Sequence, residues 1–305
     1  MKIVFMGTPS FAVPCLNALL QTDHTVVGVF TQPDRPKGRG KKPQASPVKE
    51  RAEEAGIPVY QPERIRVDGI EQFRALQPDL CVTAAFGQII SQEMLDIPIH
   101  GCINVHASLL PEHRGASPVA HAIMAGDRKT GVTTMKMDAG IDTGPILLQS
   151  ETEIRDSETC EELTERLSNI GAELLITTLK KLEEGTLKEI QQDESRMTYD
   201  PMLTKNLSEI DFHLSAARIC GLINGLNPWP CASVPIHGGR LKLMRAAVTE
   251  GTGTPGSILT ADHRQGLKIA CGNGAVRIIE LQAPGGKILR AEDYLRGHNL
   301  EKELL

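Results

Sequence analysis

The sequence has few aromatic side chains and no long apolar run. Of its 305 residues, 3% are Phe, Trp or Tyr, and there is a single Trp. No stretch approaches the roughly 18 apolar residues that a membrane span needs. Met1-Lys2 leads directly into an apolar run without the pattern of a secretory signal peptide. We therefore expect a cytoplasmic protein that contacts no membrane.

The seven cysteines show neither a pairing nor a metal-binding pattern. They are odd in number and scattered, and no two of them form a Cys-x-x-Cys pair. Most stand among apolar neighbours, as Cys81 does between Leu80 and Val82, which is typical of small buried side chains. We expect no disulfide and no metal site.

Two common catalytic motifs are also missing. Gly7-Thr8-Pro9 follows the first apolar run as a phosphate-binding turn would, but the Gly-x-Gly-x-x-Gly pattern of dinucleotide-binding proteins is absent. The Gly-x-Ser-x-Gly elbow of serine hydrolases is absent as well. A nicotinamide-dependent enzyme and a serine hydrolase are therefore both disfavoured.

Short apolar runs alternate with helix-like patterns through the first 190 residues. The runs predict strands at 2–7, 25–31, 79–85, 102–106 and 131–137. Helices between successive strands need crossover connections, so we expect a Rossmann-like α/β fold with a doubly wound, mainly parallel sheet. Ser46-Pro47 resembles the start of a helix, and the longest helix is predicted from about Ser157 to Glu184, with Gly185 as its stop.

The hydrophobic periodicity changes after a polar segment at 191–195. Short runs separated by glycine-rich turns then follow at 232–236, 241–247, 267–270 and 275–281. Such spacing favours a small antiparallel barrel, here of the OB type. The sequence therefore predicts a catalytic domain over 1–189, a linker over 190–205 and a C-terminal β-barrel domain over 206–305.

The net charge of −5 is unevenly divided along the chain. Residues 206–305 hold 11 Lys and Arg against 9 Asp and Glu, so the first 205 residues hold 22 against 29. That acidic part nevertheless contains a run of five cations spaced by Gly and Pro: Arg35, Lys37, Arg39, Lys41 and Lys42. Taken alone, the run fits a solvated loop better than a nucleic-acid contact.

Asn104 and His106 are the first candidate site residues. Residues two apart on a strand point to the same side, and these two stand at the carboxyl end of a predicted strand, where open α/β sheets place their sites. An amide N–H and an imidazolium N–H suit a developing oxyanion. Considered alone, the pair fits a buried histidine satisfied by its neighbours better than a catalytic pair.

Asp142 lies in a glycine-flanked loop that begins at Asp138. An aspartate in such a loop commonly caps a turn. Together with Asn104 and His106, however, it would complete an Asn-His-Asp set for acyl transfer that uses no nucleophilic serine or cysteine.

These motifs together resemble the folate-dependent formyltransferases. The resemblance rests on Asn104-Val-His106-Ala-Ser-Leu-Leu-Pro111, Gly131-Val-Thr-Thr-Met-Lys-Met and Asp138-Ala-Gly-Ile-Asp142-Thr-Gly. It extends over essentially the whole chain through Phe5-Met-Gly7-Thr-Pro-Ser, the basic run and Asn227-Pro-Trp229-Pro. Within the family, the chain is most similar to the members that act on tRNA. The resemblance implies transfer of a formyl group from 10-formyltetrahydrofolate to the α-amino group of methionyl initiator tRNA, for translation initiation.

The resemblance also implies residue roles. Asn104, His106 and Asp142 would be catalytic, and the Leu110–Pro111 bond would be cis. The basic run Arg35, Lys37, Arg39, Lys41 and Lys42 would contact the acceptor arm of the tRNA. Folate would be held by two segments, Phe86, Gly87, Gln88 and Ile89 in one, and Ser108, Leu109, Leu110 and Pro111 in the other. We expect a monomer without a metal, in which Trp229 is a packing anchor.

Two other functions stay open at this point. Enzymes that formylate an amino-sugar nucleotide share the Asn-His-Asp site and can carry a second domain of similar size. A non-catalytic RNA-binding protein on the same scaffold would need only the basic surfaces. The basic run and Gly7-Thr8-Pro9 favour the tRNA enzyme over the sugar enzyme.

Overall fold

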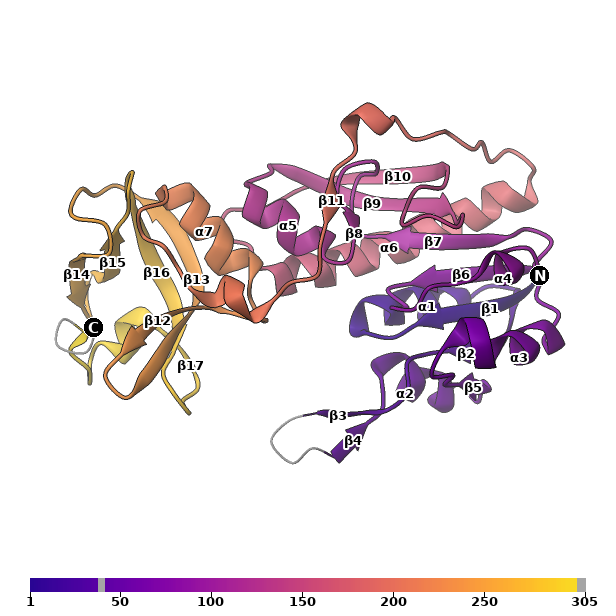
Figure 1. The fold of residues 1–305 in the computed structure, drawn as a ribbon, viewed down its shortest axis with the longest axis horizontal. Coiled ribbons are helices and arrows are strands. Elements are labelled where there is room, and N and C mark those ends of the chain that lie inside the picture. The colour runs from indigo at the N-terminus through magenta and orange to yellow at the C-terminus, as the bar shows by residue number, and fades with distance from the viewer. Residues whose placement is uncertain (38–41, 301–305) are drawn as a thin grey trace. The chain divides into compact units, whose positions relative to one another are not determined.

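The computed structural model describes residues 1–37 and 42–300 of the chain, which form two compact units (Figure 1). The first unit consists of Met1–Gly115, Gly131–Thr152 and Thr164–Tyr199. The second consists of Ala116–Thr130, Glu153–Leu163 and the chain from Asp200 onward. The second unit therefore includes two segments from within the range 1–189.

A seven-stranded sheet forms the core of the first unit. Its strand order is β10 (Ile146–Glu153), β9 (Lys129–Lys136), β7 (Cys102–His106), β6 (Leu80–Ala84), β1 (Lys2–Gly7), β2 (Thr25–Phe30) and β5 (Val59–Tyr60). β5, β2, β1, β6 and β7 are parallel, whereas β9 is antiparallel to β7. The predicted Rossmann-like sheet and its five predicted strands are confirmed, while β5 and β10 were not expected.

Side-chain hydrogen bonds mark where some of the helices of the first unit begin. They are α1 (Val13–Leu19), α2 (Pro47–Glu54), α3 (Ile70–Ala75), α4 (Gln92–Leu95) and α6 (Cys160–Glu183). The Ser46 hydroxyl accepts the Lys49 N–H at the start of α2, as Ser46-Pro47 predicted. The long helix begins later than predicted because Thr159 and Glu162 bond reciprocally and start α6 there.

Buried apolar residues fix the sheet against its helices. Strands β1 and β6 are buried along almost their whole length, as expected for strands covered on both faces. Phe30 stacks on Tyr60 and meets the edge of Phe73. Cys15 is fully buried in α1, and this burial raises the pKa of its thiol to about 12, so it behaves as an apolar side chain.

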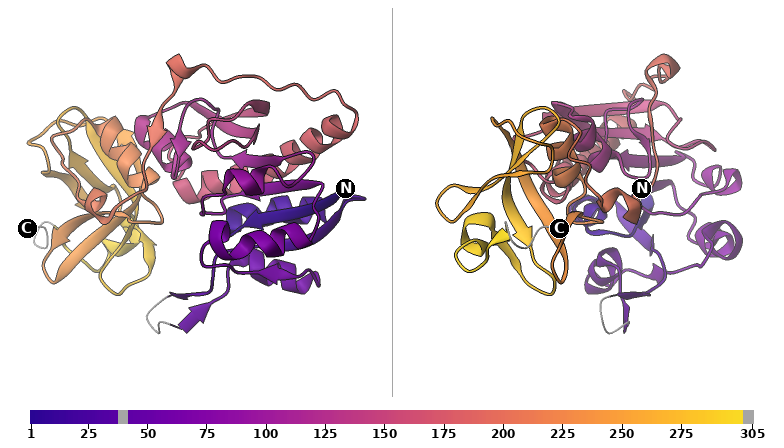
Figure 2. Two further views of the ribbon diagram at one scale, coloured as in Figure 1. Left: turned by 45° about the vertical axis from the view of Figure 1, so that its right-hand side comes forward. Right: turned by 60° about the vertical axis from the view of Figure 1, so that its left-hand side comes forward.

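The first and last residues of the basic run, Arg35 and Lys42, belong to two short strands that extend away from the sheet (Figures 1 and 2). Strands β3 (Arg35–Lys37) and β4 (Lys42–Gln44) pair antiparallel. Asp34 anchors the hairpin's base through Lys49 and Gln61, each at 2.7 Å. Arg35 is exposed. Arg39 and Lys41 lie outside the described residues.

The second unit is built on an antiparallel sheet with helices packed against it. The strand order is β12 (Ala232–Ile236), β13 (Gly239–Thr249), β16 (Ala275–Gln282), β15 (Gly266–Ala270) and β14 (Ile258–Asp262), and β17 (Ile288–Arg290) pairs with β16. The four predicted strands and the small antiparallel domain are confirmed. Helices α5 (Pro118–Ala125) and α7 (Ala216–Gly225) pack together, and α8 (Ala291–Tyr294) packs on β15, β16 and β17.

Close packing of α7 on α5 depends on glycine. A Cβ on Gly221 would lie 2.9 Å from the Ile123 carbonyl, and one on Gly225 would lie 2.7 Å from the Met124 side chain. After α7 the chain turns through Trp229, which is 51% exposed, so the predicted packing anchor is wrong. Asn227 has that role instead, because its buried amide donates to the Met244 carbonyl at 2.7 Å.

No helix within residues 1–37 and 42–300 is long and apolar enough to cross a membrane.

The remaining elements are two short strands, β8 (Arg114–Gly115) and β11 (Tyr199–Asp200), which pair with each other, and short 3-10 or π turns.

Candidate active site

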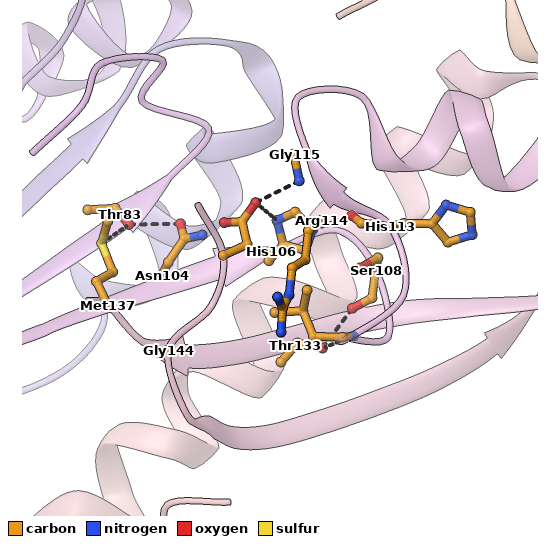
Figure 3. Close-up of polar contacts among 12 residues, drawn as sticks. Thr83, Asn104, His106, Ser108, His113, Arg114, Gly115, Thr133, Met137 and Gly144 are labelled. Atoms are coloured by element: carbon orange, nitrogen blue, oxygen red, sulfur yellow. Dashed lines mark hydrogen bonds and ion pairs between the residues drawn. The ribbon is translucent and has the colours of Figure 1, made fainter. Parts of the chain in front are cut away.

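Asn104 and His106 lie at the carboxyl end of β7, and their side chains extend from the same side of the strand (Figure 3). The register of the sheet places Asn104 beside Thr83 of β6 and His106 beside Thr133 of β9. Asn104 is half-buried and His106 is 6% exposed. Both positions follow from the parallel order of β6 and β7 and the period of two along a strand.

The amide of Asn104 has a defined orientation. The buried Thr83 hydroxyl donates to Asn104 Oδ1 at 2.8 Å. The amide nitrogen is therefore on the other side of the group, facing the side on which His106 lies (Figure 3). The sequence reasoning missed Thr83, although a hydroxyl within the buried run Leu80–Ala84 was a usable signal.

The two ring nitrogens of His106 face different groups. Nε2 lies 2.9 Å from the carbonyl oxygen of His113, and Nδ1 lies 3.7 Å from Oδ2 of Asp142. A carbonyl only accepts, so Nε2 carries the proton of the neutral ring. Nδ1 is then the nitrogen that gains a proton when the imidazole becomes cationic, and that charge would face the Asp142 carboxylate.

Asp142 and Asp138 have different roles in the loop after β9. Oδ2 of Asp142 accepts the Gly115 N–H at 2.9 Å and is the same oxygen that faces His106. Asp138 instead accepts from the Gly140 N–H and from the Thr143 hydroxyl at 2.7 Å. The turn-capping reading of an aspartate in this loop therefore applies to Asp138.

The conformation of this loop is sterically demanding. Asp142 has a φ of 54°, in the left-handed region that non-glycine residues rarely adopt. A Cβ on Gly144 would lie 1.9 Å from the Lys136 carbonyl oxygen, so only glycine fits where the loop returns to β9. Asp142 thus depends on its neighbours to hold an unfavourable backbone conformation.

The side chains of Ser108 and Leu110 are engaged within the protein. The Ser108 hydroxyl donates to the Glu112 carbonyl at 2.6 Å, and Leu110 is buried against Met135 and Ile146. The Leu110–Pro111 bond is cis, as the resemblance implied. Pro111 is buried and Leu109 is half-buried.

The segment 86–89 is tied down by side chains from neighbouring loops. The Phe86 carbonyl accepts from the Thr8 hydroxyl at 2.9 Å, and Gln32 Nε2 donates to the Gly87 carbonyl at 2.8 Å. Gln88 bonds the backbone of Ile65 and Pro62, whereas Ile89 is 67% exposed. The Gly7-Thr8-Pro9 turn therefore supports this segment through Thr8.

The structure brings Asn104, His106 and Asp142 together, whereas Arg35 lies on the separate hairpin formed by β3 and β4 (Figure 1). In the part of the chain that the structure describes, no group of three or more His, Cys, Asp or Glu is arranged to hold a metal ion. The assembled polar groups are thus an amide, an imidazole and a carboxylate.

Comparisons with known proteins agree over the whole length of the chain. Residues 1–179 match the formyl transferase family, and residues 202–299 match the formyl transferase C-terminal domain. The chain is 50% identical over 300 residues to a methionyl-tRNA formyltransferase of Trichlorobacter lovleyi, which covers 98% of this chain and 95% of that protein. It is 47% identical over 302 residues to one of Geobacter metallireducens, covering 99% and 97%.

Solved structures share the fold at lower identity. An N-formyltransferase from Helicobacter canadensis, in complex with folinic acid and dTDP-3-aminofucose, superposes with a TM-score of 0.71. It is 18% identical, and the match covers 91% of this chain and 99% of that one. At this identity the likeness concerns the fold alone, whereas the identity to the full-length relatives is decisive. The chain belongs to the methionyl-tRNA formyltransferase family.

Proposed function

We propose that this protein transfers the formyl group of 10-formyltetrahydrofolate to the α-amino group of methionyl initiator tRNA. The observation that carries the proposal is the convergence of an oriented amide donor, an imidazole and a carboxylate at one strand end. This set suits attack by an external amine, because the acceptor itself provides the nucleophile. We place the reaction in the cytoplasm, where translation starts, and the enzyme as a monomer.

Asn104 and His106 are the proposed oxyanion donors. The folate co-substrate supplies an activated formyl group, whose oxygen gains negative charge as the amine attacks its carbon. The Asn104 N–H groups and the Nδ1–H of cationic His106 would donate to that oxygen. Removing one such donor typically costs about 3–4 kcal/mol, or a factor of roughly 100–1000 in rate.

Asp142 would stabilise the cationic form of His106 and accept the proton that the amine loses. Its carboxylate faces His106 Nδ1, and the Gly115 N–H holds the oxygen concerned. The amine adds to the formyl carbon to give a tetrahedral oxyanion, which collapses as the bond between the formyl carbon and the folate nitrogen breaks. The proton that the amine loses passes through Asp142 or water to that folate nitrogen.

The folate fits two fixed backbone segments, 86–89 and 108–111. Hydrogen bonds from Thr8 and Gln32 hold the first segment, and the Thr133 hydroxyl, which donates to the Ser108 carbonyl at 2.7 Å, holds the second. Because the Ser108 hydroxyl is engaged and Leu110 is buried, we assign contact to the backbone of both segments, with the accessible side chains Leu109 and Ile89.

The tRNA would meet the basic run at 35–42 and the second unit. The run holds five of the cations in an otherwise acidic first 205 residues. Alanine at Arg39, Lys41 and Lys42 should weaken tRNA affinity and reduce the slope of log affinity against log salt by about 2–3. Unchanged affinity and slope would remove the run from tRNA recognition.

A direct assay tests the function. The full chain is incubated with 10-formyltetrahydrofolate and either methionyl initiator tRNA or a nucleotide-linked amino sugar, and formylation of each is measured. Product on the tRNA alone is expected, and product on the sugar alone would overturn the proposal. Asn104→Ala should lower turnover by a factor of roughly 100–1000 while tRNA binding is retained, whereas a non-catalytic RNA-binding protein would show no turnover to lose.

A further inference from the structure

A polar segment that follows α6 runs across the outside of the first unit, from the end of that helix to β11 (Figures 1 and 2). We call residues 189–198 the strap. It lies within the first unit although its composition resembles a linker. Glu189 pairs with Lys136 at 2.7 Å, and Ile190 exchanges backbone hydrogen bonds with Ile146 at 2.8 and 2.9 Å. These contacts fix the strap beside the start of β10.

Gln192 of the strap holds the loop that carries Asp142. Its Nε2 donates to the Asp142 carbonyl at 2.8 Å and to the Gly144 carbonyl at 2.7 Å. Its Oε1 accepts from Arg114 Nε at 3.0 Å and from Arg114 Nη2 at 2.8 Å. Both amide protons and both oxygen lone pairs of Gln192 are therefore used.

Arg114 fixes the orientation of the Gln192 amide. The Arg114 side chain is 3% exposed, and its guanidinium also pairs with both carboxylate oxygens of Glu194, at 2.6 and 3.0 Å. An arginine has no acceptor atom, so the oxygen of Gln192 must face Arg114 and its nitrogen must face the loop. The strap thus contributes both the amide and the carboxylate that secures the arginine.

The strap also holds the group at the other nitrogen of His106. The His113 carbonyl lies 2.9 Å from His106 Nε2. The His113 N–H donates to the Thr198 hydroxyl at 2.7 Å, and the neighbouring Arg114 N–H donates to the Thr198 carbonyl at 3.0 Å. The partners of both ring nitrogens are therefore tied to one segment of ten residues.

We propose that the strap positions His106 and Asp142 for formyl transfer, and that Gln192 is its principal positioning residue. The inference rests on the proposed function. Asp142 occupies a left-handed backbone conformation, which is unfavourable for a non-glycine residue and persists only when neighbouring groups hold it. Without the two hydrogen bonds from Gln192 the loop relaxes and the carboxylate moves away from His106. A misplacement of about 1 Å can cost about a hundredfold in rate.

Two substitutions at Gln192 separate its donors from its size. Gln192→Glu keeps the shape and the acceptor for Arg114 but loses both donors and brings a negative charge to the two carbonyl oxygens. Gln192→Met keeps the length without polar atoms. Both should lower kcat about 10- to 100-fold and leave KM for folate and tRNA within about threefold.

The matched control is Arg196→Gln. Arg196 pairs with Glu112 at 2.7 Å and thus also joins the strap to the 108–115 segment, but this exposed pair does not contact the Asp142 loop. Its kcat should stay within about twofold of the unmodified protein, because exposed pairs contribute little.

A double-mutant cycle identifies the residue through which Gln192 acts. In an Asp142→Asn background, measured under single-turnover conditions, Gln192→Met should change the rate by less than about threefold, because groups that act as one unit are not additive. An equal loss of rate in both backgrounds would assign Gln192 a general structural role and overturn the proposal. So would Gln192 variants that behave like the control.

An NMR measurement tests the strap independently of turnover. The ¹⁵N signals of the His106 ring report its tautomer and its partners, and Gln192→Met should shift them whereas Arg196→Gln should not. Unchanged His106 signals in Gln192→Met would overturn the positioning role. If the unmodified protein formylates no methionyl-tRNA, the proposed function fails, while the ring signals still decide the role of the strap.

Discussion

Replacing Asp142 by Asn tests the charge of the site separately from its geometry. In the structure one oxygen, Oδ2, both accepts the Gly115 N–H at 2.9 Å and faces His106 Nδ1 at 3.7 Å. The amide oxygen of Asn can occupy that position, because the Gly115 N–H requires an acceptor there. Asp142→Asn therefore removes the negative charge and keeps the hydrogen bond, whereas Asp142→Ala removes both.

The magnitude follows from the separation of the two groups. Unit charges 3.7 Å apart interact by about 1 kcal/mol in water and about 4.5 kcal/mol at an effective dielectric constant of 20. The side chains of His106 and Asp142 are 7% and 16% exposed, so the pair lies between these limits. About 2–3 kcal/mol of lost stabilisation of the imidazolium corresponds to a fall in kcat of about 30- to 150-fold.

The assay is single-turnover formyl transfer at saturating folate and methionyl-tRNA, with thermal unfolding as the control for folding. The single-turnover rate of Asp142→Asn should be about 30- to 150-fold lower, with an unchanged midpoint of thermal unfolding. Asp142→Ala should fall further, because the Gly115 N–H then also loses its acceptor. An Asn variant within about threefold of the unmodified rate, beside an Ala variant that is strongly impaired, would refute the electrostatic role and leave only the hydrogen bond.

Three further outcomes are expected. Thr83→Val should lower kcat by about 2- to 10-fold without changing KM, because the Asn104 amide loses the hydrogen bond that orients it, worth about 1 kcal/mol. Thr83→Ser keeps the hydroxyl and should restore the rate. Gly144→Ala should lower the free energy of unfolding by more than about 2 kcal/mol in a denaturant titration, since its Cβ would overlap the backbone of β9. The hydrogen bond from Arg114 lowers the pKa of Glu194. The Glu194–Arg114 pair should therefore stabilise the fold fully above the unfolded-state pKa of Glu, about 4.3, and this contribution should be lost as the pH falls through the lower folded-state pKa. An NMR titration that gives a Glu194 pKa at or above about 4.3 would contradict this.

The sheet could be predicted from the sequence because its signal is local. Strands β1, β6 and β7 are short, mainly apolar runs, and such a run indicates a strand that is buried on both faces. The pair Asn104 and His106 was accessible for a similar reason, since both side chains stand on one strand and the period of two places them on one side. β5 was missed because it has two residues, and β10 because its outer half alternates with polar side chains.

The remainder of the site depends on contacts between distant residues. Thr83 acts on Asn104 from the neighbouring strand, 21 residues away along the chain. The distinction between Asp138 and Asp142 is equally hidden, because both stand in one glycine-flanked loop and only the direction of their carboxylates separates the cap from the site residue. The packing role expected for Trp229 was wrong, because the buried side chain of that turn is Asn227.

The strap shows why a segment can be fixed in place and still resemble a linker. Sequence periodicity detects elements that bury apolar side chains, and Gln191-Gln192-Asp193-Glu194-Ser195 has none to bury. Its inward partner is instead the buried guanidinium of Arg114, which only polar side chains can satisfy. Gln192 and Glu194 both bond it, from either side of Asp193, where a short 3-10 turn (Glu194–Arg196) begins. A buried arginine must be paired. The strap therefore needs polar side chains, here Gln192 and Glu194, where it passes Arg114. The composition that suggested a flexible connection is therefore the composition needed to hold the Asp142 loop by hydrogen bonds.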